Sequence, residues 1–149
     1  MTIELIAFTS RGRVLARKLA DQLISCGHRA ACSRQEGQTA AEWARQAFGR
    51  AQALVFVGAA GIAVRSIAPI VHSKAVDPAV VVVDERGQFA IPVLSGHLGG
   101  ANDLAREIAA LLGGQAVITT ATDVNGVFGV DQWARRQGLV VCRPEQIVD

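Results

Sequence analysis

The chain has 149 residues and a mass of 15.7 kDa, which is the size of one ordinary domain. Half of its residues are hydrophobic and 19% are charged, so the composition excludes a disordered or acidic-tail protein. Apolar stretches such as Ala79–Val83 are far too short to span a bilayer, and Glu4 interrupts the first apolar segment, which argues against a secretory signal. We therefore expect a single cytoplasmic domain over residues 1–149, with no membrane partner.

The formal net charge is only +2, but 13 of the 15 basic residues are arginines, because Lys18 and Lys74 are the two lysines. The planar fork of a guanidinium suits carboxylates and phosphates, which favours an anionic small-molecule partner. A codon preference for arginine in the source genome explains the count equally well. No basic run is interleaved with aromatic residues and tyrosine is absent, so a nucleic-acid partner is disfavoured.

The cysteines and histidines do not form a recognisable metal-binding pattern. Cys26, Cys32 and Cys142 are odd in number and lack a C-x-x-C pair, so reduced thiols are expected rather than a disulfide framework or a zinc site. The three histidines also lack the spacing of paired metal ligands. The sequence therefore predicts no protein metal site.

The first half of the chain alternates strand and helix patterns. Leu15, Leu19 and Leu23 recur at helical spacing, and Gly27 is placed to end that helix. Thr39–Glu42 is a capping box ahead of a second helix. Strands are predicted at Ile3–Phe8, Arg29–Ser33 and Ala53–Val57.

The middle of the chain predicts a short helix and then a hairpin. The helix lies around Ile62–Ile67 and is stopped by Pro69. Ala79–Val83 and Gln88–Leu94 flank a tight turn and form the predicted hairpin. Pro92 cannot donate a backbone hydrogen bond, so the second of these strands is expected to be an edge or to carry a bulge.

The last third predicts a strong helix in which Leu104, Ile108 and Leu112 form one apolar stripe. Alternating strands and helices imply an α/β fold, a mainly parallel, open, Rossmann-like sheet with helices on both faces. The remaining predictions are strands at Ala116–Thr119 and Leu139–Cys142, a helix near Asp131–Arg136, and the start of another helix at Pro144–Asp149.

Four loops carry small or polar residues where a strand leads toward a helix: Thr9–Gly12, Gly58–Gly61, Ser95–Asn102 and Thr119–Asp123. In open α/β sheets ligands bind beyond the carboxyl ends of the strands, so we expect these loops to share one anion-receptive rim. Tight turns explain any single loop, whereas the four together favour a binding site. The chain has no G-x-G-x-x-G, P-loop or G-x-S-x-G motif, which disfavours ordinary nucleotide binding and serine hydrolysis.

Three side chains in or near these loops could carry chemistry. His97 lies in a glycine-rich loop and is either a general acid or base near neutral pH or a histidine that braces the loop. Asp123 could orient such a histidine or activate water, and could equally cap its own turn. Arg65 could pair with a substrate carboxylate, or form an ordinary surface salt bridge.

The segments GAAGIAVRSIAP (Gly58–Pro69), DPAVVVVDERGQFAIPVLSGHLGGAN (Asp77–Asn102) and TTATD (Thr119–Asp123) resemble the amino-terminal part of the cobalt-precorrin-5A hydrolase family of anaerobic cobalamin biosynthesis. The likeness runs through most of Phe56–Trp133 and is weaker before it. The second segment is the most specific, because many residue types recur in one order.

The resemblance implies a cytoplasmic enzyme that opens the δ-lactone ring of a cobalt-containing tetrapyrrole and releases acetaldehyde. The cobalt would belong to the substrate, so no cofactor of the protein's own is expected. The acetate and propionate arms of the macrocycle agree with arginine-rich loops. Family members continue into a middle region and a carboxyl-terminal domain, so this chain resembles the amino-terminal domain alone and would have those regions as partners.

Within that resemblance, loop position and chemistry assign His97 as acid or base, with Asp123 beside it. The N–H groups of Gly99 and Gly100 would stabilise negative charge, and Arg65 would position a carboxylate arm. The full set of residues expected to bind the substrate is Arg65, Gly58, Gly61, Ser95, Gly96, Gly99, Gly100, Asn102, Thr119 and Thr120.

Two alternatives stay open: a non-catalytic corrinoid-binding or docking module, and a generic phosphate- or nucleotide-binding α/β domain. The strand Val80–Val83 could be the edge of a homo-oligomer or a central buried strand.

Overall fold

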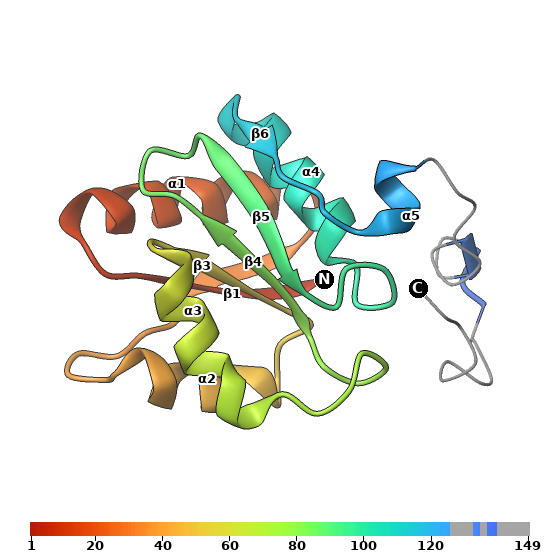
Figure 1. Cartoon of the computed structure of the whole chain (residues 1–149). Coiled ribbons are helices and arrows are strands. Elements are labelled where there is room, and N and C mark those ends of the chain that lie inside the picture. The colour runs from red at the N-terminus through yellow and green to blue at the C-terminus, as the bar shows by residue number, and fades with distance from the viewer. Residues whose placement is uncertain (126–132, 135–136, 140–149) are drawn as a thin grey trace.

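Runs of β-branched and aliphatic residues form one twisted sheet with the strand order β2-β1-β3-β4-β5-β6 (Figure 1). The computed structural model describes residues 1–125, 133–134 and 137–139. Within that part, the strands are β1 (Thr2–Ala7), β2 (Arg29–Cys32), β3 (Ala53–Val57), β4 (Ala79–Val83), β5 (Phe89–Leu94) and β6 (Gln115–Ala116).

The first four strands of the chain are parallel, and β5 turns back. β1 pairs in parallel with β2 and β3, and β3 pairs in parallel with β4. β5 runs antiparallel to β4, which confirms the predicted hairpin, and β6 is parallel to β5. The pairing of β4 with β5 shifts register between Val80 and Val81, opposite Pro92, so the predicted bulge is present while β5 is not an edge strand.

Helices cover both faces of the sheet (Figure 1). α1 (Ser10–Ser25) and α4 (Ala101–Leu112) pack on one face. α2 (Ala40–Phe48) and α3 (Ala60–Ile67) pack on the other, and α2 begins with the predicted capping box. A short 3-10 helix (Ala68–Ile70) follows α3, and α5 (Ala121–Val124) follows β6. This arrangement confirms the predicted α/β, Rossmann-like class.

Strand periodicity divides the core into two layers. In β3, Val55 faces α1 and α4, whereas Leu54 and Phe56 face α2 and α3. Trp43 of α2 is fully buried and meets the Phe56 ring edge-to-face, with 5.2 Å between ring centroids. Burying one such large apolar side chain stabilises the fold by about 1.5–3 kcal/mol. The continuous apolar run of β4 is thus a central strand buried on both faces.

β6 is shorter than the predicted strand at Ala116–Thr119, and the reason is Pro92. The Val117 N–H donates to Ala90 O at 2.9 Å. The next rung of a parallel ladder would need an N–H at position 92, which proline lacks. The chain therefore leaves the sheet after Val117.

Several remaining expectations fall on the tail of the chain. The predicted helix near Asp131–Arg136, the strand near Leu139–Cys142 and the helix start at Pro144–Asp149 lie largely or wholly outside the described residues. Among the described residues, no helix combines the length and the apolar character needed to cross a membrane.

Candidate functional site

The hairpin places the four expected loops at two opposite edges of the sheet, not at one rim. Gly58 follows β3 and donates from its N–H to Val83 O at 2.8 Å, so the Gly58–Gly61 loop lies at the carboxyl ends of β3 and β4. β5 runs the other way, and its last residue, Leu94, pairs with Val80 near the start of β4. The expectation of a single shared rim is therefore wrong.

The two loops that carry His97 and Asp123 do come together. Both follow strands that end at the amino edge of the parallel strands, because β6 is parallel to β5. Asp123 lies in α5, and its carboxylate accepts a hydrogen bond from His97 Nε2 at 2.6 Å. The exposed fraction of each side chain is below a tenth, 8% for His97 and 9% for Asp123. The site to consider is this buried histidine–aspartate pair.

Backbone geometry fixes the loop between β5 and α4. Ser95 has a positive φ of 56°, and its hydroxyl donates to Asp77 O at 3.0 Å. Gly100 has a φ of 85°, which side chains other than glycine adopt rarely. A Cβ at Gly99 would strike Ser95 Cβ and come within 2.8 Å of Ser95 O. These two glycines are required by the fold of the loop itself.

One of the two expected backbone donors is already engaged. The Gly100 N–H donates to His97 O at 3.0 Å, closing a turn around the histidine. The prediction that this N–H stabilises negative charge on a substrate is therefore wrong for Gly100. Within the described part of the chain the Gly99 N–H makes no hydrogen bond, so Gly99 stays a candidate donor.

Three further side chains converge on the same carboxylate. Asn102 Nδ2 donates to Asp123 Oδ2 at 2.9 Å, and the Thr120 hydroxyl donates to it at 2.7 Å. Arg106 Nη2 pairs with the other oxygen, Asp123 Oδ1. Together with His97, these contacts engage both carboxylate oxygens. Asp123 is thus the centre of a polar network rather than a simple cap of its own turn.

The network determines the protonation state of Asp123. Burial acts to raise the pKa of this carboxyl group, but hydrogen bonds from Arg106, His97 and Thr120 outweigh burial and hold the pKa well below its ordinary value. Asp123 is therefore a carboxylate near neutral pH and accepts hydrogen bonds only. Because it accepts from His97 Nε2, that nitrogen carries a proton. Such a weakly basic carboxylate suits orienting the imidazole better than abstracting a proton.

Asn102 holds the loop and the carboxylate together. Its side chain is almost completely buried, at 1% exposed, and Nδ2 also donates to Thr120 Oγ1 at 2.8 Å. Its Oδ1 is buried and has no hydrogen-bond partner among the residues that the structure describes. A Cβ at Gly96 would lie 2.9 Å from that oxygen, so the absence of a side chain at position 96 makes room for the amide.

Sequence reasoning missed Arg106. Asn102 and Arg106 are four residues apart on α4, a spacing that puts both side chains on one face of a helix. The same face carries the contacts to Asp123. This helical spacing, combined with the expectation for Asn102, was the signal that could have identified Arg106.

The remaining expected residues are not joined to this network. Gly58 and Gly61 lie at the carboxyl edge of the parallel strands. Arg65 is exposed on α3, and it forms no hydrogen bond or ion pair with the described His97 or Asp123 side chains. Thr119 is exposed next to Thr120. Among the described residues, no group of three or more His, Cys, Asp or Glu side chains could hold a metal ion.

The fold and the site define an α/β domain with a buried histidine–aspartate pair at one edge of a mainly parallel sheet. Residues 42–123 match the protein family described as Cobalamin synthesis G N-terminal. The chain belongs to this family, which confirms the resemblance seen in the sequence and gives the chain a role in cobalamin biosynthesis. The matched residues include the whole histidine–aspartate network.

Two curated relatives carry the same name. A cobalt-precorrin-5A hydrolase of Salmonella typhimurium is 49% identical over 138 residues, which cover 89% of this chain and 39% of the relative. A cobalt-precorrin-5A hydrolase of Priestia megaterium is 52% identical over 87 residues, which cover 58% of this chain and 23% of the relative. This chain thus spans well under half the length of either protein.

A solved structure shares the fold. A crystal structure of a candidate cobalamin biosynthesis protein G homolog from Sulfolobus solfataricus superposes with a TM-score of 0.71 at 26% identity. The match covers 98% of this chain and 43% of the solved chain. The α/β architecture described here is therefore also that of a cobalamin-related protein.

Proposed function

We propose that this chain acts as the amino-terminal domain of a cobalt-precorrin-5A hydrolase, with His97 as its acid–base residue. The observation that carries the proposal is the 2.6 Å hydrogen bond between His97 Nε2 and a buried Asp123 carboxylate. Family membership and two relatives of that name support the choice of substrate. The cobalt travels with the substrate, and the protein needs no metal or organic cofactor of its own.

The reaction proceeds in two steps that both need proton transfer. Water adds to the acyl carbon of the δ-lactone, the acyl C–O bond breaks, and a carboxylate and an alcohol are formed. The alcohol then loses its proton, its carbon–carbon bond to the macrocycle breaks, and acetaldehyde leaves as the electron pair stays on the macrocycle. A single positioned imidazole can take the first proton and return it later.

Each residue of the network has a distinct task in this scheme. His97 removes a proton from water and later from the alcohol. Asp123 keeps the imidazole oriented and stabilises its protonated form, as the carboxylate of a histidine–aspartate pair does in general. Asn102 and Arg106 are positioning residues, because they act on Asp123 rather than on the substrate. The Gly99 N–H is the remaining backbone donor for the developing oxyanion.

A chimeric enzyme tests the proposal directly. In it, this chain replaces the aligned region of the Salmonella typhimurium relative, and acetaldehyde release from cobalt-precorrin-5A is measured. His97→Ala should lower turnover by ~10²-fold or more, the usual contribution of a general acid–base residue. His72→Ala is the matched control, because His72 is an exposed histidine outside the network. Equal turnover of the His97→Ala and His72→Ala enzymes would remove His97 from the mechanism.

The alternative function is a non-catalytic module that presents the macrocycle to other domains. In that case the chimera would shift the visible spectrum of a cobalt corrinoid on binding, and His97→Ala would weaken this binding. The turnover of bound substrate would not fall in addition. Measuring the spectral titration and acetaldehyde on the same samples separates the two functions.

A further inference from the structure

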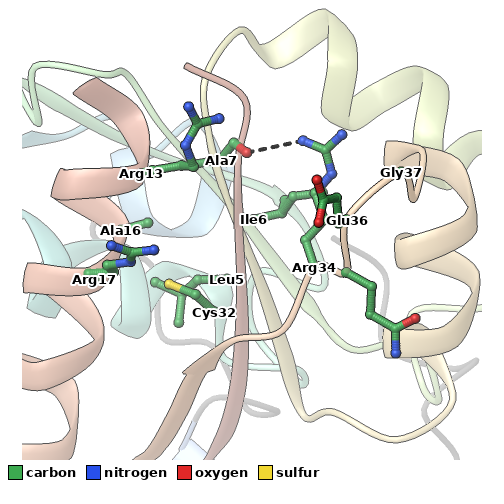
Figure 2. Close-up of a pocket in the computed structure, with 11 residues that line it drawn as sticks. Leu5, Ile6, Ala7, Arg13, Ala16, Arg17, Cys32, Arg34, Glu36 and Gly37 are labelled. Atoms are coloured by element: carbon green, nitrogen blue, oxygen red, sulfur yellow. Dashed lines mark hydrogen bonds between the residues drawn. The ribbon is translucent and has the colours of Figure 1, made fainter. Parts of the chain in front are cut away.

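A cavity of about 560 Å³ lies at the carboxyl ends of β1 and β2 (Figure 2). This edge of the sheet is opposite the histidine–aspartate pair. Its floor is formed by Leu5–Ala7 of β1, and its walls come from α1 and from the segment that follows β2. The volume lies within the range of small-molecule sites, roughly 300–1,000 Å³. Open α/β sheets bind ligands beyond the carboxyl ends of their parallel strands, and this cavity lies at that edge.

Three arginines surround the cavity from two sides. Arg13 and Arg17 are one helical turn apart on α1, and Arg34 projects from the segment after β2 (Figure 2). Among the described residues, no carboxylate forms an ion pair with any of the three. Glu36 is the one acidic residue in the lining, so the cavity carries an excess of positive charge.

Two of these guanidinium groups are held in place without being neutralised. Arg34 Nε donates to Gln38 O at 2.8 Å, and Arg34 Nη1 donates to Ala7 O at 3.4 Å. The same guanidinium lies over the Phe8 ring, with 5.7 Å between Arg34 Cζ and the ring centroid. Arg13 donates to Phe8 O at 3.3 Å and to Ser10 Oγ at 3.1 Å. All of these acceptors are neutral. The donors are therefore ordered before a ligand arrives, which lowers the entropy lost on binding.

We infer that this cavity binds a small organic anion with at least two carboxylate groups. Each guanidinium fork can engage one carboxylate through paired N–H donors, and forks on facing walls match carboxylates at both ends of a ligand. This site is separate from the proposed hydrolase centre, because the two lie at opposite edges of the sheet and beside different strands.

Calorimetric titration of the full 149-residue chain with citrate tests the inference. Citrate carries three carboxylates, and acetate and inorganic phosphate serve as comparison ligands. One citrate per chain should bind, more tightly than acetate or phosphate, and affinity should fall as salt is raised. Absence of citrate binding would overturn the proposal, and tighter binding of phosphate would overturn the ligand class.

Charge-removing variants locate the binding. Arg34→Gln should weaken citrate binding by about tenfold or more, and Arg34→Lys should recover only part of it, because lysine keeps the charge but not the fork. Arg45→Gln removes the same charge from the exposed face of α2, outside the cavity, and should leave affinity within about twofold. Equal losses in Arg34→Gln and Arg45→Gln would show general charge attraction and not this site.

Cysteine labelling gives an independent readout in the unaltered chain. Cys32 lines the cavity, whereas Cys26 is exposed outside it. Bound citrate should slow alkylation of Cys32 several-fold and leave Cys26 unchanged. Equal rates at Cys32 with and without saturating citrate would place the ligand elsewhere and overturn the proposal.

Discussion

Asp123 shows how side-chain contacts can keep a nearly buried carboxyl group ionised. Burial alone raises the pKa of such a group, because the charged form loses its hydration. Here hydrogen bonds from Arg106, His97 and Thr120 replace those of water, and the pKa falls instead. Arg106 is partly exposed, at 42% of its side chain, so salt screens its contribution. These hydrogen bonds therefore stabilise the charged form of Asp123 beside His97, although both side chains are nearly buried.

Stability should therefore depend on Asp123 at acidic pH. The pKa of this group is lower in the folded chain than its ordinary value of 3.8, so the folded state binds fewer protons than the unfolded state in that range. Its stabilising effect is complete above about pH 4 and is lost as pH falls through the lower folded value. Urea unfolding from pH 2 to 7 should show the free-energy difference between wild type and Asp123→Asn shrinking below pH 4.

The exposed Asp21→Asn change is the control for that measurement, because Asp21 lies on α1 away from the network. The unfolding free energy of Asp21→Asn should change with pH in the same way as that of wild type. A difference between wild type and Asp123→Asn that stays constant down to pH 2 would contradict the assigned direction of the pKa shift.

At the scale of elements, the turn between β5 and α4 determines where the histidine lies. Gly100 is the N-cap residue of α4 and has a left-handed conformation that reverses the chain, and Ala101 N donates back to Ser95 O at 3.1 Å. Gly99 packs against Ser95 with no space for a side chain. The turn is thus a rigid connection that presents His97 to α5.

Two glycine-to-alanine changes should have opposite effects on stability. Gly99→Ala should destabilise the chain by about 1–3 kcal/mol, the usual result of overpacking. Gly61→Ala should be neutral or stabilise by up to about 1 kcal/mol, because Gly61 lies in α3, has open space at its Cβ position and has no positive φ. Thermal and urea unfolding would measure both. Similar destabilisation by the two changes would contradict the packing argument.

The elements themselves could largely be predicted from the sequence. Ala53–Val57 and Ala79–Val83 were predicted with the bounds that the structure shows, because continuous apolar runs between turn residues have few other solutions. The strand after α4 was predicted too long. Its length depends on which residue of β5 lies opposite, and that partner, Pro92, is distant along the chain.

At the scale of the whole molecule, one antiparallel strand divides the polar loops between two edges. The histidine–aspartate pair lies at the amino edge of the parallel strands, and the arginine-lined cavity lies at the carboxyl edge. No described contact joins the two. Substitutions in the histidine–aspartate pair and in the cavity should therefore change the free energy of unfolding independently, since residues farther apart than ~10 Å rarely couple.

A double-mutant cycle measures this independence. The changes in unfolding free energy of His97→Ala and Arg34→Gln should add within about 0.5 kcal/mol in the double variant. His97→Ala combined with Asn102→Ala is the positive control, because both side chains contact Asp123 and should couple. Coupling of His97 with Arg34 as strong as that of His97 with Asn102 would show that the two edges form one unit.

The sequence by itself determined the class of the fold, the hairpin and the family, and it singled out His97, Asp123 and Asn102 as candidate site residues. These follow from local periodicity, turn residues and an ordered run of motif residues, all of which are short-range properties of the chain. Only the tertiary structure decided which loops meet, because strand direction depends on pairing between distant segments. It separated Gly58 and Gly61 from His97, added Arg106 to the network, and gathered three arginines around a cavity that no motif had indicated.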